Sequence, residues 1–322
     1  RESVSILVPM RNEENNAANC VTSLISQNGL MDFEILVLDD NSTDQTMKEL
    51  SKFSEIKPLN GKTLPDGWLG KLWALEQLVS ASRGKYLVFI DADVRLTPHA
   101  VASAIKQMQD WDFISAYPKQ ITSGFIQRLF QPLLQWSWLA SVPLIISQKF
   151  SVKSMVVANG QFLIIKREAY LISGGFDPIK SEVLDDLMIA KQLVKSGFKG
   201  GVAEASNVAT CQMYDTLMQL IKGYQKSLWR AFGSPLGSIA AVALLFVTGV
   251  LPLIATLLGS EIGLITFSLI LLSRIISAIR TNTLPNTALL HPLAILFLIG
   301  LIAYSWFGKL TNSLTWRDRA VV

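Results

Sequence analysis

Residues 85–93 read KYLVFIDAD, an apolar strand-forming run that ends in two carboxylates one residue apart. Two similar runs come earlier, SVSILVP at 3–9 and FEILVL at 33–38, and each also ends in polar or acidic residues. Helix-like stretches alternate with these runs, at 14–27, 44–54 and 71–82. Continuous apolar strands that alternate with helices predict an α/β fold with a mostly parallel sheet covered on both faces.

Ligands of such sheets bind beyond the carboxyl ends of the strands. Acidic residues follow three successive predicted strands, at 13–14, 39–44 and 91–93. Like charges that crowd together repel each other, so this arrangement predicts a bound cation. Asp91 and Asp93 can supply the oxygen ligands that Mg²⁺ or Mn²⁺ prefers, with positions left open for substrate phosphates. Such an ion would offset charge on a leaving diphosphate.

Each of these acidic groups has a structural alternative. A pair of aspartates one residue apart is common on protein surfaces, although the apolar residues 87–90 make a surface turn less suitable here. For Asp44 we expect a helix-capping role rather than contact with a ligand.

The carboxyl-terminal third of the chain is strongly apolar. Half of the 322 residues are hydrophobic, and the excess collects after residue 236. Runs at 236–258, 262–279 and 288–307 predict about three transmembrane helices. We therefore expect a catalytic domain at 1–215, an amphipathic interface helix at 216–235 and a membrane domain at 236–322. Arg274 inside the second run is costly unless it is paired, faces a polar cavity or reaches the interface.

Two further segments have the pattern of helices at a membrane surface. Residues 124–150 are apolar but broken by Pro132 and Pro143, and their helical spacing sets apolar residues opposite glutamines. An ordinary amphipathic core helix is the alternative. Lys222, Lys226 and Arg230 are spaced four apart, which suits lipid headgroups or, alternatively, a solvated helix face.

Composition bounds the remaining possibilities. The net charge of +4 fits a protein that lies against anionic lipid. No basic tract with interleaved aromatic residues supports nucleic-acid binding. The two cysteines, Cys20 and Cys211, have no metal-type spacing and suit a reduced, cytosolic compartment. We expect no signal peptide, although the natural protein can extend upstream.

An ordered set of motifs resembles family 2 glycosyltransferases of the GT-A fold. The strings are VSILVPMRNEE, FEILVLDDNSTDQT, GKLWAL, YLVFIDADVRLTP, ANGQFLIIKREAYLISGGFD, EVLDDLMIAKQLVKSGF and, more loosely, GYQKSLW. They span roughly residues 3–230. Together with CQMYDT and the trailing apolar runs, they are most similar to the membrane-associated subgroup implicated in carotenoid and hopanoid glycosylation. The resemblance implies a Rossmann-like mixed, mostly parallel sheet.

The resemblance also implies roles for the residues after the strands. Pro9 and Glu13 would line the nucleoside pocket, and Asp40 would hydrogen-bond the base. Lys71 would approach the diphosphate, where a cation is useful. Asp91 and Asp93 match the metal-binding pair, and Asp91 would also contact the nucleotide-sugar.

Further matches concern the transfer step. The Glu-Asp motif of the family falls on Asp185-Asp186, which makes Asp186 the expected catalytic base and Asp185 its competitor. Gln225 and Trp229 match the outer positions of the Gln-x-x-Arg-Trp motif, whose Arg position is Leu228 here, a departure that weakens a processive, cellulose-synthase-like function. Gly160 and Gln161 would lie in the acceptor and donor region, although a plain turn is the alternative for Gly160.

The expected activity is therefore inverting, metal-dependent transfer of a sugar from a nucleotide-diphosphate donor, a UDP-sugar by expectation. The acceptor would be a hydroxyl of a hydrophobic lipid such as a carotenoid. One alternative is a polyprenyl-phosphate acceptor, with Arg274 and the basic stripe at 222–230 as phosphate binders. The other is a membrane protein that binds nucleotide-sugar without catalysis. The basic stripe favours a cytoplasmic catalytic domain, for which we expect a bacterial plasma membrane.

Overall fold

A computed structural model describes residues 3–141, 144, 148, 155–316 and 319–320. The chain divides into two compact units, Arg1–Lys119 with Pro143–Cys211 and Gln120–Val142 with Gln212–Val322. We call the first the sheet unit and the second the helical unit. Of the predicted interface segment, residues 142–143, 145–147 and 149–150 lie outside the described residues.

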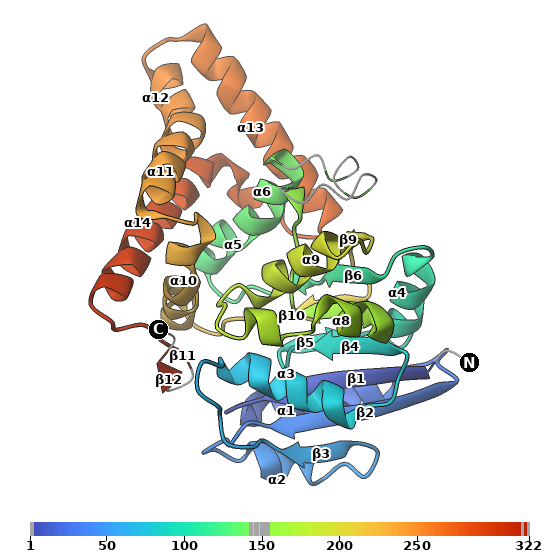
Figure 1. Cartoon of the computed structure of the whole chain (residues 1–322). Coiled ribbons are helices and arrows are strands. Elements are labelled where there is room, and N and C mark those ends of the chain that lie inside the picture. The colour runs from blue at the N-terminus through green and yellow to red at the C-terminus, as the bar shows by residue number, and fades with distance from the viewer. Residues whose placement is uncertain (1–2, 142–143, 145–147, 149–154, 317–318, 321–322) are drawn as a thin grey trace. The chain divides into compact units, whose positions relative to one another are not determined.

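The sheet unit is built on a seven-stranded sheet with the order β3-β2-β1-β4-β8-β6-β9 (Figure 1). Its strands are β1 (Ser3–Met10), β2 (Asp32–Asp39), β3 (Lys57–Asn60), β4 (Tyr86–Ile90), β6 (Phe113–Tyr117), β8 (Phe162–Lys166) and β9 (Gly200–Glu204). Only β8 runs against its neighbours, because it pairs antiparallel with both β4 and β6. The other pairs are parallel, which confirms the predicted mixed, mostly parallel sheet.

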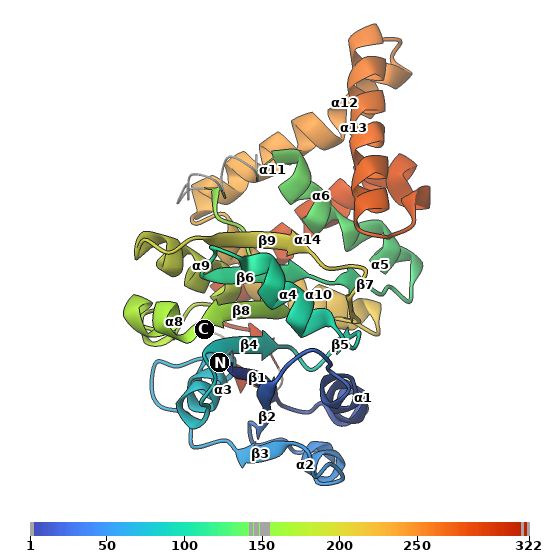
Figure 2. The same cartoon turned by 90° about the vertical axis from the view of Figure 1, so that its right-hand side faces the viewer.

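Helices cover both faces of this sheet. In Figure 2, α3 (Gly70–Ala81), α8 (Arg167–Ser173) and α9 (Asp185–Lys195) lie on one side, and α1 (Glu14–Ile25) and α4 (Ala100–Met108) lie on the other. All five residues of β4 are buried, since its alternate side chains pack toward opposite helical layers. The short elements are α2 (Thr46–Leu50), η2 (Asp177–Ile179) and a small sheet of β5 (Val94–Leu96), β10 (Ala209–Cys211) and β7 (Lys119–Gln120).

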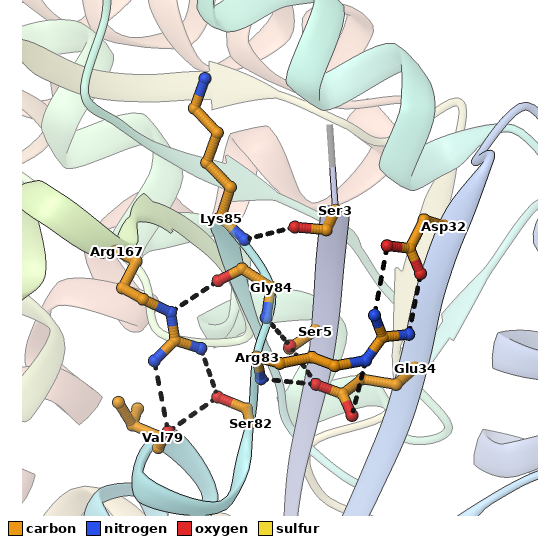
Figure 3. Close-up of polar contacts among 10 residues, drawn as sticks. All are labelled: Ser3, Ser5, Asp32, Glu34, Val79, Ser82, Arg83, Gly84, Lys85 and Arg167. Atoms are coloured by element: carbon orange, nitrogen blue, oxygen red, sulfur yellow. Dashed lines mark hydrogen bonds and ion pairs between the residues drawn. The ribbon is translucent and has the colours of Figure 1, made fainter. Parts of the chain in front are cut away.

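A polar network fixes the amino ends of the central strands (Figure 3). The hydroxyl of Ser5 accepts a hydrogen bond from the Gly84 N–H at 2.7 Å and donates one to Glu34 at 2.7 Å. Arg167 donates from Nε to the Gly84 carbonyl at 2.6 Å. A Cβ at Gly84 would lie 2.4 Å from the backbone nitrogen of Ser5, so only glycine allows this close approach. The carboxyl ends of the strands lie at the opposite edge of the sheet, outside this network, and are available for functional side chains.

The helical unit contains three helical stretches that are long and apolar enough to cross a membrane. They are Pro235–Leu257, Glu261–Arg280 and Pro285–Leu310, which confirms the predicted runs within the described residues. The first comprises α11 (Pro235–Gly249) and α12 (Leu251–Leu257), which break at Val250 just before Pro252. The other elements are α5 (Phe125–Phe130), α6 (Pro132–Ser141), α10 (Leu217–Ala231), α13 (Glu261–Arg280), η3 (Pro285–Leu290), α14 (His291–Leu310), β11 (Thr315–Trp316) and β12 (Arg319–Ala320).

The glutamines of α5 and α6 are not on an exposed polar face. Gln127, Gln131 and Gln135 are between 2% and 4% exposed, whereas Phe125 is 59% exposed. The apolar residues at 129, 130 and 133 are buried as well, so this segment buries both its glutamines and its apolar side where α6 packs against α13 and α5 packs against α14.

Candidate active site

Four charged side chains and one glycine converge on a single pocket of the sheet unit. Asp91 directly follows β4, Lys71 is the second residue of α3, and Asp185 and Asp186 begin α9. Gly160 lies just before β8. Apolar residues complete the lining: Leu75, Phe89, Ile90, Leu163, Phe176 and Ile189. The structure thus brings together five of the predicted site residues from four different segments of the chain.

Lys71 stands between two carboxylates. Its Nζ lies 2.9 Å from Oδ1 of Asp91 and 3.5 Å from Oδ2 of Asp185. Burial alone would lower the pKa of Lys71, but the charges of Asp185 and Asp91 outweigh it and raise the pKa above its ordinary value. The ammonium group therefore stays charged, and its side chain, 40% exposed, remains open to a ligand.

Asp186 is held by backbone amides. Its carboxylate accepts hydrogen bonds from the N–H of Gly160 at 3.1 Å and from the N–H of Leu187 at 2.7 Å. A Cβ at Gly160 would lie 3.2 Å from the Cβ of Asp186 and 3.7 Å from Nζ of Lys71. The missing side chain of Gly160 thus keeps the space between these two groups open. The turn alternative alone does not explain that proximity.

The two adjacent aspartates have different surroundings. Asp185 faces Lys71, whereas Asp186 is oriented by the two N–H groups. Burial, and then the charge of Asp185, raises the pKa of Asp186 to about 6, although Leu187, Lys71 and Gly160 partly oppose the shift. Both carboxylates occupy the amino-terminal turn of α9, where the helix dipole favours negative charge. The surroundings of Asp186 suit a proton acceptor, whereas Asp185 pairs with the lysine.

Asp93 fits a role in holding a cation. Its Oδ1 is buried and finds no hydrogen-bond partner among the described residues, while the thiol of Cys211 donates to the carboxylate. Burial, then the charges of Asp91 and Glu13, raises the pKa of Asp93 to about 7. A buried carboxylate oxygen without a partner, beside a second carboxylate, is relieved by a divalent cation. Asp91 and Asp93 therefore suit Mg²⁺ or Mn²⁺.

Protein ligands for such an ion would be few. In the part of the chain that the structure describes, no group of three or more His, Cys, Asp or Glu residues is arranged to hold a metal. Two carboxylates leave the remaining positions for water and for substrate oxygens, which is the usual pattern for Mg²⁺ at phosphate sites.

The predicted nucleoside residues lie at the same edge of the sheet. Pro9 is opposite Leu38 in the parallel pairing of β1 and β2, and the N–H of Asp40 donates to Met10 at 2.8 Å. Glu13 accepts a hydrogen bond from Asn16 at 2.8 Å. These three predicted residues do not line the pocket around Lys71.

Gln161 acts through its backbone. It is 3% exposed, and its carbonyl accepts a hydrogen bond from the N–H of Asp91 at 3.2 Å. Its own N–H donates to Asn159 at 2.8 Å. Gln161 therefore fixes the loop before β8 against the end of β4.

Sequence reasoning missed Arg95. Its guanidinium donates to the carbonyls of Ala92 and Val94 at 2.7 and 2.8 Å, and to Oδ1 of Asn16 at 2.8 Å. Asn16 in turn donates to Glu13, so Arg95 ties the loop that carries Asp93 to α1. The feature of the sequence that could have identified Arg95 is its position two residues after Asp93.

Asp44 accepts hydrogen bonds from backbone N–H groups, as expected for a residue that caps a helix. Its carboxylate accepts hydrogen bonds from the N–H of Thr46 at 3.0 Å and from the N–H of Glu14 at 3.1 Å. Thr46 begins α2, so Asp44 caps the first turn of that helix, although Gln45 occupies the N-cap position.

Gln225 and Trp229 belong to the helical unit. The N–H of Trp229 donates to Oγ of Ser305 at 2.8 Å, and the same hydroxyl donates to the carbonyl of Gln225. Nζ of Lys309 lies 4.5 Å from the centre of the Trp229 ring. These contacts connect both residues to α14, and a role in acceptor or donor binding stays a prediction.

Comparison with known proteins shows what the chain is similar to. The profile described as "Glycosyl transferase family 2" matches residues 5–171, more than half of the chain. The 4,4'-diaponeurosporenoate glycosyltransferases of Staphylococcus haemolyticus and Staphylococcus aureus are 24% and 25% identical to it. The two alignments cover 77% and 80% of this chain, and 67% and 68% of the relatives.

One solved structure shares the fold over nearly the whole chain. It is the mannosyltransferase PcManGT from Pyrobaculum calidifontis in complex with GDP-Man and Mn²⁺, with a TM-score of 0.56 and 17% sequence identity. The match covers 98% of this chain and 88% of that structure. It confirms the predicted GT-A fold.

The geometry of Asp93 generates a test of metal binding. We expect Asp93→Asn to weaken Mn²⁺-dependent binding of nucleoside diphosphates by about tenfold or more, because one of two carboxylate ligands is lost. Calorimetric titration of UDP and GDP, with Mn²⁺ and with EDTA, measures this. The exposed Asp66→Asn variant is the matched control and should bind as the parent does. Equal Mn²⁺ dependence in Asp93→Asn would exclude this carboxylate as a ligand.

Proposed function

Because the chain belongs to glycosyl transferase family 2, we propose that it transfers a sugar from a nucleoside-diphosphate donor to a hydrophobic lipid acceptor. The observation that carries this proposal is the pocket in which Lys71 lies 2.9 Å from Asp91 and lines the same surface as Asp185 and Asp186. It combines a fixed cation for a diphosphate with a carboxylate suited to accept a proton.

Lys71 would bind the diphosphate of the donor. Its ammonium is held by Asp91 and Asp185, so it is already oriented before a ligand arrives. Asp91 and Asp93 would hold Mg²⁺ or Mn²⁺, which supplies positive charge to offset the leaving diphosphate. We take a UDP-sugar as the first donor to test.

Asp186 would act as the base for a hydroxyl acceptor. The acceptor oxygen forms a bond to the anomeric carbon, the bond from that carbon to the diphosphate breaks, and the hydroxyl proton passes to Asp186. A single displacement of this kind inverts the anomeric configuration. The N–H groups of Gly160 and Leu187 hold the carboxylate in one orientation. A base with a pKa of about 6 is deprotonated at neutral pH and still accepts a proton in the transition state.

The acceptor we propose is a lipid-soluble molecule such as a carotenoid. The bacterial relatives are named for the carotenoid 4,4'-diaponeurosporenoate, and the helical unit has three candidate membrane spans. We place the helical unit in a bacterial plasma membrane and the sheet unit in the cytoplasm, where Lys222, Lys226 and Arg230 of α10 would meet anionic lipid.

A polyprenyl phosphate is the second candidate acceptor. Arg274 supports it, because this cation is 4% exposed and forms no ion pair with any described residue. The oxygen of a phosphate or carboxylate is already ionised, so Asp186 would not need to take a proton from it.

A donor and acceptor screen tests the proposal. Purified full-length protein in detergent is incubated with Mn²⁺ and each common nucleotide sugar, and release of free nucleoside diphosphate is followed. We expect one donor to respond to a hydroxylated carotenoid and the release to stop with EDTA. Stimulation only by a polyprenyl phosphate would select the second candidate. No donor binding and no release with any acceptor would contradict a catalytic function.

The raised pKa of Asp186 predicts the pH dependence of transfer to a hydroxyl. Turnover should fall as the pH is lowered through about 6, because the protonated carboxyl cannot accept the proton. Asp186→Asn should lose about a hundredfold or more in kcat, since general-base catalysis contributes roughly 10²–10⁴-fold. The KM for the donor should change little.

The control for this variant is Asp177→Asn, whose carboxylate is 69% exposed and pairs with Lys180. It should keep the parental kcat and pH profile. Normal turnover in Asp186→Asn, together with a loss in Asp185→Asn, would assign the base to Asp185 instead.

A further inference from the structure

The helical unit contains a buried arginine whose charge is not balanced. Arg274 lies in the middle of α13, is 4% exposed, and its Nη1 finds no hydrogen-bond partner among the described residues. The described acidic residues of this unit are Asp215 and Glu261. Asp215 accepts a hydrogen bond from Gln212, and Glu261 is exposed at the start of α13, about 20 Å of helix away at 1.5 Å per residue. The guanidinium therefore has no carboxylate partner among them.

Trp136 connects Arg274 to His291. The guanidinium carbon of Arg274 lies 5.8 Å from the centre of the Trp136 ring, and the His291 ring lies 4.7 Å from it, edge to face. The indole N–H donates to Oγ of Ser273 at 2.8 Å, which fixes the ring orientation. A Cβ at Gly249 would lie 3.3 Å from Nε2 of His291, so the end of α11 also packs closely against this histidine. The three side chains thus come from α6, α13 and the start of α14.

Other polar atoms in the same segments also lack partners. Neither ring nitrogen of His291, which is fully buried, has a hydrogen-bond partner among the described residues. The same is true of both amide atoms of Gln131 and of the amide oxygen of Gln135, which directly precedes Trp136. Such groups cost free energy when they are buried without partners, and natural proteins leave few of them. Arg274 and His291, which both lie against the Trp136 ring, therefore indicate a ligand that supplies the missing bonds.

We propose that Arg274, with Trp136 and His291, forms a binding site for the anionic end of a lipid-soluble molecule, a carboxylate or a phosphate on an apolar chain. An intramembrane arginine is stable when it pairs with an anion, and its planar fork matches both carboxylate and phosphate oxygens. The ring of His291, which contacts Trp136, can add a hydrogen bond. The exposed apolar side chains of α13, such as Ile275 and Ile276, suit a hydrocarbon chain.

This inference rests on the proposed function, and within it on the second candidate, because an acceptor with an anionic end is a polyprenyl phosphate or another lipid acid and not an uncharged hydroxylated carotenoid. Its test needs neither donor nor turnover. A failed binding test would therefore leave glycosyl transfer standing, and an absence of turnover would leave the binding result intact.

The experiment compares three ligands with the same chain and different ends. Geranylgeranoic acid, geranylgeranyl phosphate and geranylgeraniol are titrated calorimetrically into full-length protein in nanodiscs of zwitterionic lipid. We expect at least one of the two anions to bind about tenfold or more tightly than the alcohol. Tight binding of the acid or of the phosphate would identify the source of the anion. Equal affinities for all three ligands would overturn the proposal without any variant.

Variants then assign the preference to Arg274. Arg274→Gln should lose about tenfold or more in affinity for the preferred anion and leave binding of the alcohol unchanged. Arg274→Lys keeps the charge but lacks the planar guanidinium group. Its affinity for the preferred anion should therefore lie between those of the parent and of Arg274→Gln. Arg280→Gln, at the exposed end of the same helix, is the matched control and should bind as the parent does. Parental anion binding in Arg274→Gln, or an equal loss in Arg280→Gln, would contradict the site.

Discussion

The pairing of Lys71 with Asp91 and Asp185 is the interaction on which the catalytic pocket depends. Three carboxylates meet there from the end of β4 and the start of α9, and one ammonium group lies 2.9 Å from the first and 3.5 Å from the second. Without that ammonium group the carboxylates would repel each other, and some of them would become protonated and lose their charge. The charge of Lys71 therefore favours the ionised form of Asp186, which the proposed role of that carboxylate requires.

The two units carry opposite charge imbalances. The edge of the sheet unit has more negative groups than Lys71 can balance, and Asp93 keeps a buried oxygen without a described partner. The helical unit has one buried cation, Arg274, without a described anion. A divalent cation with a nucleoside diphosphate would complete the first site, and an anionic lipid would complete the second.

Much of the sheet unit could be predicted from local pattern. The strand that ends at Ile90 and the pair Asp91 and Asp93 follow from an apolar run with acidic residues after it, and the parallel sheet then places strand ends together. The contact between Gly160 and Asp186 could not be predicted in this way, since the two residues are 26 positions apart and meet only through packing.

The helical unit shows where periodicity is insufficient. Gln131 and Gln135 were expected opposite the apolar residues of their segment, yet both sides are buried, because helix spacing defines two faces and does not say which of them meets a neighbour. The grouping of Trp136, Arg274 and His291 joins residues from three elements. The sequence alone indicated that placing Arg274 in a membrane span costs free energy. It did not predict which residues surround Arg274.

Anomalous scattering from Mn²⁺ in crystals grown with a nucleoside diphosphate would test the catalytic pocket most directly. We expect a manganese peak at the carboxylates of Asp91 and Asp93, with Lys71 in contact with a diphosphate oxygen. A diphosphate bound elsewhere, with Lys71 still confined to its two carboxylates and no manganese at Asp93, would contradict the assignment of this pocket to sugar transfer.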